Sequence, residues 1–227
     1  LILEKIYKKM IQPQISKKPV SWVLKMPLLD KVVLNKIRET LMNAFGGEFS
    51  QIIIGGAPLN AEVEAFLRRI KFPVTVGYGM TETAPLISFT PWDRFRSQSC
   101  GQVLKGFMEA RIANPDADGV GEIQVRGENV MVGYYKNEQA TKDSFTADGW
   151  LRTGDLGVID EDGYIYIKGR CKTMLLGPSG QNIYPEEIEA KINNMPYVLE
   201  SLVLQKDTRL VALVCPDFEA VDADKLT

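Results

Sequence analysis

The stretch VTVGYGMTET at residues 74–83 runs from a short apolar strand into a turn that contains two glycines. The glycines let the backbone approach a flat ring, and Tyr78 between them offers a face for stacking. Thr81 can hydrogen-bond a phosphate oxygen, and Glu82 can hold Mg²⁺ beside it. Taken alone, the stretch is equally typical of a tight turn with a surface threonine and glutamate.

A strand, a helix and a second strand are predicted around this turn. Residues 52–54 are apolar and run into GGAPL at residues 55–59, after which Asn60 can cap a helix. The apolar residues of that helix recur at Val63, Phe66, Leu67 and Ile70. Open α/β sheets bind ligands at the carboxyl ends of their strands, so both turns should form walls of a slot for adenine. Without this spacing, GGAPL is more typical of an ordinary strand-to-helix turn.

Two helices are predicted nearer the beginning of the chain. The first has Ile2, Ile6 and Met10 on one face, with Leu3 and Tyr7 alongside. The second covers residues 28–45, and its apolar residues are Val32, Ile37, Leu41 and Phe45. Pro13 and Pro19 are expected to interrupt the chain between the two helices.

Short strands and glycine turns dominate from about residue 98 onward. Residues 121–126 read as a strand, and residues 158–159 and 164–167 flank the sequence DEDG, which is a hairpin signal. This pattern indicates a small, mostly antiparallel β subdomain that ends near residue 170.

The last part of the chain reads as a helix followed by two strands. Pro185 lies in the first turn of the helix, and strands at residues 201–205 and 210–214 are expected to pair. The fold class is therefore α/β. We expect an α/β portion over residues 1–97, a β-rich subdomain over residues 98–170, and a small α+β domain over residues 173–227.

The composition of the 227 residues is that of a globular protein, with 45% hydrophobic residues, 25% charged residues and a net charge of −2. Such a balance gives no reason to expect a nucleic-acid partner. The chain has no histidine, so its chemistry must rely on carboxylates, lysines, backbone amides or a bound metal. The three cysteines are widely spaced, which fits reduced thiols in the cytoplasm.

No apolar run approaches the roughly 20 residues that span a bilayer, and no signal peptide is recognisable. Residues 1–36 are basic, with eight lysines against Glu4 and Asp30. A solvated helix face is the favoured interpretation of these lysines, and peripheral contact with a membrane surface or an anionic ligand is the alternative.

Two charged residues end later motifs. Asp155 closes GWLRTGD at residues 149–155, and its two oxygens can accept from both adjacent hydroxyls of a ribose. Arg170 closes GYIYIKGR at residues 163–170, where a hairpin can deliver it toward the same ribose. The alternatives are a turn aspartate and a surface ion pair, which contributes little to stability.

These motifs, together with GQNIYPEEIE at residues 180–189, stand in an order that resembles the adenylate-forming enzymes. That superfamily includes acyl-CoA synthetases, luciferases and peptide-synthetase adenylation domains. The resemblance covers roughly residues 45–215. It implies the end of a large adenylation domain with its β subdomain, followed by a truncated C-terminal lid.

The resemblance also implies roles for individual residues. The nucleotide-binding residues would be Gly56, Ala57, Tyr78, Gly79, Thr81, Asp155 and Arg170. Tyr78 would stack on adenine and Asp155 would hold the ribose. Catalysis would involve Thr81 at the α-phosphate and Glu82 as the Mg²⁺ ligand. Lys172 matches the hinge about which the lid rotates between two half-reactions.

The implied function is an AMP-forming acyl-CoA synthetase, which uses ATP, Mg²⁺ and coenzyme A. The loop sequence Pro178-Ser179-Gly180 resembles long-chain fatty acyl-CoA synthetases, so a fatty acid is the expected substrate. The alternatives are a ligase that loads a carrier-protein phosphopantetheine, and a nucleotide-binding module without catalysis.

Two parts of such an enzyme are not recognisable in the chain. These are the Ser/Thr/Gly-rich phosphate loop and the catalytic lysine of the lid, for which Lys225 lies too close to the hinge. We therefore expect a piece of a longer enzyme that is inactive by itself.

Overall fold

The computed structural model describes residues 2–18, 22, 26, 29–56, 59–177, 179–207 and 209–223. The chain divides into two compact units. Unit 1 contains Leu1–Glu109, Gly127–Val132 and Asp160–Ile165, and unit 2 contains Ala110–Arg126, Gly133–Ile159 and Tyr166–Thr227.

The predicted strand–helix–strand arrangement is confirmed in unit 1. Strands β1 (Ile52–Ile54) and β2 (Val74–Val76) are parallel, and helix α5 (Ala61–Arg69) connects them. The side chain of Asn60 caps the helix by accepting from the amides of Glu62 and Val63 at 2.9 and 3.2 Å. The predicted apolar residues are all buried, namely Val63, Phe66, Leu67 and Ile70.

The first helical segment buries a different face from the one predicted. It consists of α1 (Ile2–Ile6), a π-helical turn η1 (Tyr7–Ile11) and α2 (Gln12–Ile15). Leu3, Tyr7 and Ile11 are buried, whereas Ile2 and Met10 are 74% and 61% exposed. Contact with α5 selects this face, because the Tyr7 ring lies 5.1 Å from that of Phe66.

The prediction that Pro13 interrupts the chain after the first helix was wrong, because helical structure continues to Ile15. Pro13 lies in the first turn of α2, where a missing backbone N–H is tolerated, and Pro19 lies outside the described residues. The described lysines of this segment, Lys5, Lys8, Lys9, Lys17 and Lys18, are exposed.

Helix α4 (Leu29–Ala44) corresponds to the helix predicted over residues 28–45, of which Leu28 is not described. Its buried residues are Leu34 and Leu41, and Val32, predicted to be on the apolar face, is 68% exposed. Two helical residues correspond to a rotation of about 200°, so Val32 points away from the face that contains Leu34.

A three-stranded sheet follows in unit 1, with the order β3 (Tyr78–Gly79), β4 (Leu86–Phe89) and β5 (Gln102–Val103). Short 3₁₀ turns η2 (Thr81–Thr83) and η3 (Trp92–Arg94) interrupt the connections. The carboxylate of Glu64 is 2% exposed and accepts hydrogen bonds from the Ser97 hydroxyl and from the Gln98 amide and side chain.

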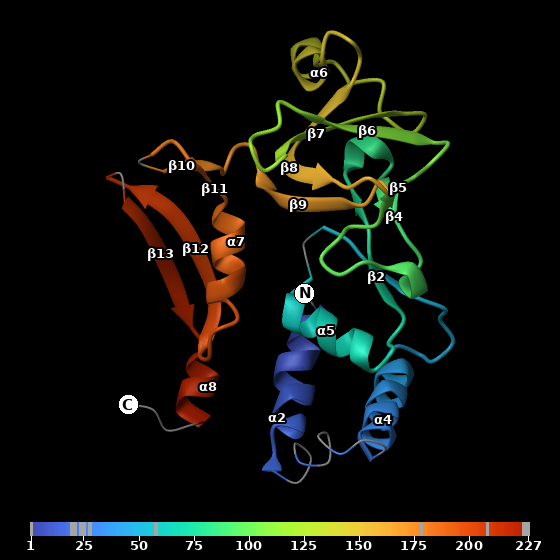
Figure 1. The fold of residues 1–227 in the computed structure, drawn as a ribbon, viewed down its shortest axis with the longest axis vertical. Helices are drawn as coiled ribbons and strands as arrows, with labels where there is room; N and C mark the ends of the chain where they lie inside the picture. Colours follow the sequence, from blue (N-terminus) through green and yellow to red (C-terminus); the bar gives the residue numbers. More distant parts are fainter. Residues whose placement is uncertain are drawn as a thin grey trace. The chain divides into compact units, whose positions relative to one another are not determined.

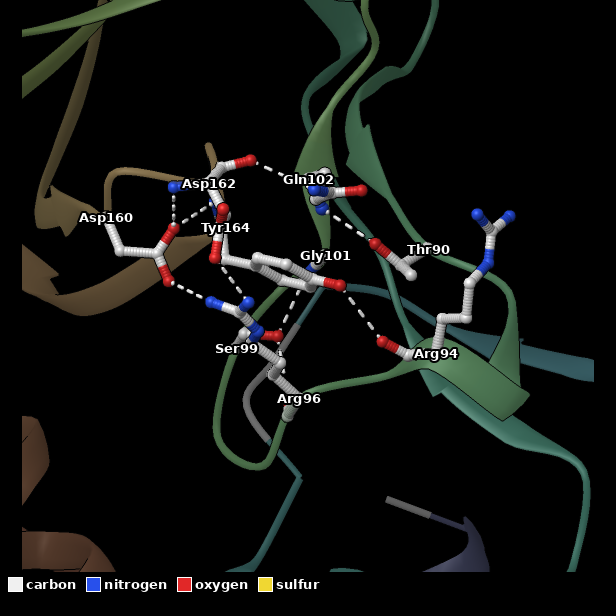
Figure 2. A network of polar contacts seen from close by, with 9 residues as sticks. All are labelled: Thr90, Arg94, Arg96, Ser99, Gly101, Gln102, Asp160, Asp162 and Tyr164. Carbon is white, nitrogen blue, oxygen red and sulfur yellow. Dashed lines mark hydrogen bonds and ion pairs between the residues drawn. The ribbon is translucent and has the colours of Figure 1, made fainter.

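The turn at residues 160–163 is tied to the segment before β5 by a polar network (Figure 2). Arg96 donates to Asp160 at 2.8 Å and to Asp162 at 2.5 Å, and its guanidinium lies 4.1 Å from the centre of the Tyr164 ring. Burial opposes ionisation of Asp160, but the Tyr164 amide and the Arg96 guanidinium outweigh it, so the Asp160 pKa lies below its usual value.

The main sheet of unit 2 has four strands in the order β6 (Met108–Ala113), β7 (Gly121–Gly127), β8 (Leu151–Ile159) and β9 (Ile165–Arg170). Helix α6 (Glu138–Ser144) lies between β7 and β8 in sequence. The predicted strand at residues 121–126 is confirmed as β7, and β8 and β9 form the predicted hairpin.

The end of unit 2 confirms the predicted helix and strand pair. Strands β10 (Leu175–Leu176) and β11 (Asn182–Ile183) pair first, and α7 (Pro185–Ile192) then lies along the antiparallel pair β12 (Val198–Lys206) and β13 (Arg209–Pro216) (Figure 1). A short helix α8 (Phe218–Ala223) follows. Among the described residues, none of the helices has the length and apolar character that a membrane span requires.

Candidate nucleotide-binding site

The two predicted turns leave neighbouring strand ends in unit 1. Ile54 at the end of β1 pairs with Val76 at the end of β2, and the amide of Gly77 donates to the carbonyl of Ile54 at 2.9 Å. A Cβ on Gly55 would lie 3.8 Å from the carbonyl oxygen of Gly77. The sheet edge therefore brings the start of both turns together, as predicted.

Gly56 has a φ of +83°, and Ala57 lies outside the described residues. A left-handed φ favours glycine because other side chains are strained there. This conformation redirects the chain directly after β1, at the point where the resemblance assigns contacts with adenine.

Gly79 makes room for the chain's own backbone. A Cβ at this residue would lie 1.7 Å from the carbonyl oxygen of Pro85. Strand β3 pairs with β4 in this region, with Gly79 opposite Leu86 and Tyr78 opposite Ser88. Glycine is therefore required here for the close approach of the two strands, whatever ligand binds beside them.

Tyr78 is 7% exposed, so most of the ring surface is already covered by the protein. Its main chain belongs to β3, which begins two residues after the end of β2. The stacking of Tyr78 on adenine stays a prediction.

Thr81 and Glu82 lie in the turn η2, where Thr81 is exposed and Glu82 is half-buried. The next residue, Thr83, is fully buried and organises the turn. Its hydroxyl accepts from the Met80 amide at 3.2 Å and lies 2.7 Å from the Pro85 carbonyl, to which it can donate. The buried hydroxyl thus leaves the two preceding side chains at the surface, where a phosphate and a metal ion can reach them.

The chemistry of Glu82 fits Mg²⁺ bound together with a nucleotide. The described residues include no group of three or more histidine, cysteine, aspartate or glutamate side chains that could hold a metal. Mg²⁺ usually needs no such group in nucleotide sites, because one or two carboxylates and the substrate phosphates suffice. Glu82 would be the protein ligand, and bound Mg²⁺ would neutralise charge on the phosphates.

The segment that follows β7 is bonded to the turn η2, and this contact was not predicted from the sequence. The Asn129 side chain donates to the carbonyls of Thr83 and Leu86 at 2.6 and 2.8 Å, and the amide of Met131 donates to the carbonyl of Glu82 at 2.8 Å. Nothing in the local pattern around Asn129 distinguishes it from an ordinary turn asparagine.

Asp155 and Arg170 meet in unit 2. Arg170 Nη1 donates to Asp155 Oδ1 at 2.7 Å, and Asp155 is 5% exposed. The amide of Cys171 donates to the carbonyl of Gly154 at 2.8 Å, which fixes the end of β9 beside the residue before Asp155. The structure therefore brings these two predicted ribose-binding residues together.

Lys172 is exposed in the turn that follows β9. Its neighbour Cys171 is half-buried, and burial, together with the nearby Glu122 and Asp155 carboxylates, raises the pKa of the thiol. On the other side, the Thr173 hydroxyl donates to Glu186 at 2.6 Å. The turn thus joins β9 to the helix α7, while the role of Lys172 as a hinge stays a prediction.

Asp116 is a second residue that the sequence did not identify. Its Oδ2 accepts from the Asn182 side chain at 3.1 Å and from the Tyr184 hydroxyl at 3.3 Å, and its Oδ1 accepts from the amide of Val120 at 2.9 Å. The bond from the Val120 amide is the main reason that the Asp116 pKa is lowered. Burial and the Asp116 carboxylate raise the pKa of Tyr184.

The predicted site residues fall into two groups. Gly56, Tyr78, Gly79, Thr81 and Glu82 belong to unit 1, and Asp155, Arg170 and Lys172 belong to unit 2. The structure brings together the starts of the two turns in unit 1 and joins Arg170 to Asp155 in unit 2. Binding of a nucleotide by these residues stays a prediction.

Solved structures of similar sequence share this fold. MatB from Rhodopseudomonas palustris bound to ATP is 34% identical with a TM-score of 0.66, over 78% of this chain and 39% of that chain. O-succinylbenzoate coenzyme A synthetase (MenE) from Bacillus subtilis in complex with AMP is 30% identical with a TM-score of 0.65, over 82% of this chain and 43% of that chain.

Curated relatives include two long-chain-fatty-acid–CoA ligases. ACSBG1 of Rattus norvegicus is 34% identical over 183 residues, which are 80% of this chain and 25% of that protein. FadD15 of Mycobacterium bovis is 34% identical over 199 residues, which are 87% of this chain and 31% of that protein. The chain spans about a quarter to a third of the length of these relatives.

Residues 9–135 match the family described as AMP-binding enzymes. This match covers more than half of the 227 residues and includes the turn with Tyr78, Thr81 and Glu82. The chain belongs to the family of AMP-binding enzymes.

Proposed function

We propose that this chain forms part of an AMP-forming acyl-CoA synthetase that activates a fatty acid. The observation that carries the proposal is the sheet edge in unit 1, where the Gly56 turn lies beside a turn that presents Thr81 and Glu82 at the surface. A ligand with a flat base and a phosphate chain suits such an edge, because apolar and glycine-rich walls lie next to a hydroxyl and a carboxylate.

The proposed assignment gives each residue one task. Gly56, Ala57 and Tyr78 contact adenine, Thr81 bonds the α-phosphate, and Glu82 is the Mg²⁺ ligand. Asp155 accepts from the two ribose hydroxyls, and Arg170, which donates to the Asp155 carboxylate, holds it in place. Lys172 is the pivot for the following residues, which we propose to be part of the lid.

Two group transfers would take place at this site. A carboxylate oxygen of the acid attacks the α-phosphorus of ATP, the bond to the bridging oxygen breaks, and pyrophosphate leaves with that electron pair. The coenzyme A thiolate then attacks the acyl carbon of the acyl-adenylate, and AMP leaves. The protein would act by positioning and by charge stabilisation, which agrees with the absence of histidine from the sequence.

The substrate proposal depends on the lid loop and on the relatives. Pro178-Ser179-Gly180 resembles the loop of long-chain fatty acyl-CoA synthetases, and ACSBG1 and FadD15 are named as long-chain-fatty-acid–CoA ligases.

The free thiols of Cys100, Cys171 and Cys215 support a location in the cytoplasm.

ATP–pyrophosphate exchange, measured on the longest natural protein that contains this chain, tests the first step. We expect exchange that requires Mg²⁺ and is fastest with long-chain fatty acids. Product analysis with coenzyme A and, separately, with a holo carrier protein tests the second step. If a thioester formed only on the carrier protein, the acceptor would be the carrier protein and not coenzyme A. If the protein bound nucleotide but catalysed no exchange with any acid, the proposal that it is an enzyme would be contradicted.

A further inference from the structure

The turn that carries Thr81 and Glu82 is held by a short segment that is remote in sequence, residues 129–131. Asn129 lies in the turn directly after β7, within the part of the chain that belongs to unit 1. Its Nδ2 donates to the carbonyls of Thr83 and Leu86 at 2.6 and 2.8 Å. One side chain therefore bridges both ends of the loop that follows Glu82.

A second contact reaches the turn from the same segment. The amide of Met131 donates to the carbonyl of Glu82 at 2.8 Å. The backbone of Glu82 and that of Thr83 are thus both bound to the segment of residues 129–131, while the buried Thr83 hydroxyl holds the turn from within. The backbone from which the Glu82 side chain projects is therefore held both by the turn's own bonds and by the segment of residues 129–131.

Among the described residues, the oxygen of the Asn129 side chain, in contrast to its nitrogen, makes no such contact. Asn129 Oδ1 is buried and has no hydrogen-bond partner in the described part of the chain. An unsatisfied buried acceptor costs free energy, and the two hydrogen bonds that Nδ2 donates offset this cost. Only the amide nitrogen can donate to two carbonyls, so the reverse orientation of the amide would place oxygen against oxygen.

We propose that Asn129 is a positioning residue that orients Thr81 and Glu82 toward the phosphates and Mg²⁺. This inference rests on the proposed function of the same turn. Asn129 itself touches the loop backbone, so its effect on the reaction passes through Glu82 and Thr81. Loss of its donors therefore changes the Mg²⁺ requirement and the rate of adenylation more than it changes the affinity for ATP, which also depends on the base and the ribose.

Asn129→Leu removes both donors and keeps the branching of the side chain, and Glu128→Gln in the same turn is the matched control because Glu128 is exposed. In pyrophosphate exchange, we expect Asn129→Leu to lower kcat at least tenfold and to raise the Mg²⁺ concentration for half-maximal rate severalfold. The KM for ATP should change less than twofold. Glu128→Gln should behave as wild type in all three measurements.

Hydrogen–deuterium exchange of the protein, measured without nucleotide or metal, gives an independent test through the peptide that covers residues 80–86. Asn129→Leu should increase exchange in this peptide, and Glu128→Gln should not. If Asn129→Leu fails to fold, Asn129→Asp, which has the same shape and lacks the donors, is judged by the same measurements. If the folded variant kept the wild-type kcat, Mg²⁺ dependence and hydrogen–deuterium exchange, the positioning role would be overturned. If the wild-type protein itself showed no pyrophosphate exchange, the proposed function would be overturned instead.

Discussion

Arg170 and Asp155 form an ion pair at 2.7 Å in which the aspartate side chain is 7% exposed and the arginine side chain is 60% exposed. The arginine can therefore be hydrated if its partner is removed, whereas the carboxylate depends on the protein for its hydrogen bonds. This asymmetry makes Asp155 the residue to substitute in a binding experiment.

Asp155→Ala should weaken the binding of AMP at least tenfold. Hydrogen bonds to a charged group each contribute about 1.5–3 kcal/mol, and a tenfold change corresponds to about 1.4 kcal/mol. Isothermal titration of the natural protein with AMP measures the effect. Asp143→Ala is the matched control, because Asp143 is exposed on α6 and bonds only the neighbouring Gln139 side chain in the described contacts. Equal affinities for wild type and Asp155→Ala would refute the ribose assignment.

Gly79→Ala should destabilise the protein by about 3 kcal/mol, because overpacking a closely packed site forces the backbone to move. The added Cβ would lie 1.7 Å from the Pro85 carbonyl oxygen. Gly55→Ala is the control, since its Cβ meets its nearest neighbour at 3.8 Å. Urea unfolding compares the two, and similar stabilities would show that the approach of β3 and β4 is less strict than the structure indicates.

Lys172→Pro should spare adenylation and slow thioester formation. Proline restricts its own φ and the preceding residue, so rotation about this turn becomes harder. The bond from the Cys171 amide to Gly154 does not involve the amide of Lys172 and can persist. Pyrophosphate exchange and thioester formation are measured separately, with Lys172→Ala as the control for loss of the charge. If both half-reactions fell by the same factor, Lys172 would not be a pivot.

The contacts of Asp116 predict a stability that depends on acid pH. Its folded-state pKa lies below the ordinary value of 3.8, so its stabilising effect is complete above that value. The effect is lost as pH falls through the lowered folded-state pKa. Asp116→Asn should therefore reduce the free energy of unfolding at about pH 5, and its difference from wild type should shrink toward about pH 3.

Urea unfolding at both pH values measures this difference. Asp118→Asn in the same turn is the control, because Asp118 is exposed and, among the residues that the structure describes, bonds Asp116 through its backbone amide and not through its side chain. A difference between wild type and Asp116→Asn that stays constant with pH would show that ionisation of Asp116 does not support the contacts with Asn182 and Tyr184.

Some elements could be predicted because their signals are local. Asn60 caps α5 from the adjacent residue, and Val63 and Leu67 recur at helical spacing, so neighbours in sequence decide this helix. The hairpin of β12 and β13 likewise depends on two apolar runs joined by a short turn. These patterns also indicated that two glycine-containing turns would begin at one edge of a sheet.

In the first helix, local signals did not predict which face is buried. Ile2 and Leu3 begin two apolar stripes that lie one residue apart, and the periodicity is satisfied by either of them. The choice of Leu3, Tyr7 and Ile11 was made by the Phe66 ring and by Glu62, to which the Tyr7 hydroxyl donates at 3.0 Å. Burial against a partner supplies free energy that periodicity alone cannot assign to one stripe.

The sequence by itself determined the family motifs, the unit of β1, α5 and β2, and the final helix with its strand pair, because residue type and spacing suffice for these. Only the tertiary structure revealed that Asn129 and Asp116 bond residues that are 43–46 and 66–68 positions away. A hydrogen bond needs its donor and acceptor within about 3 Å, and such a distance between remote residues is set by the packing of the whole unit.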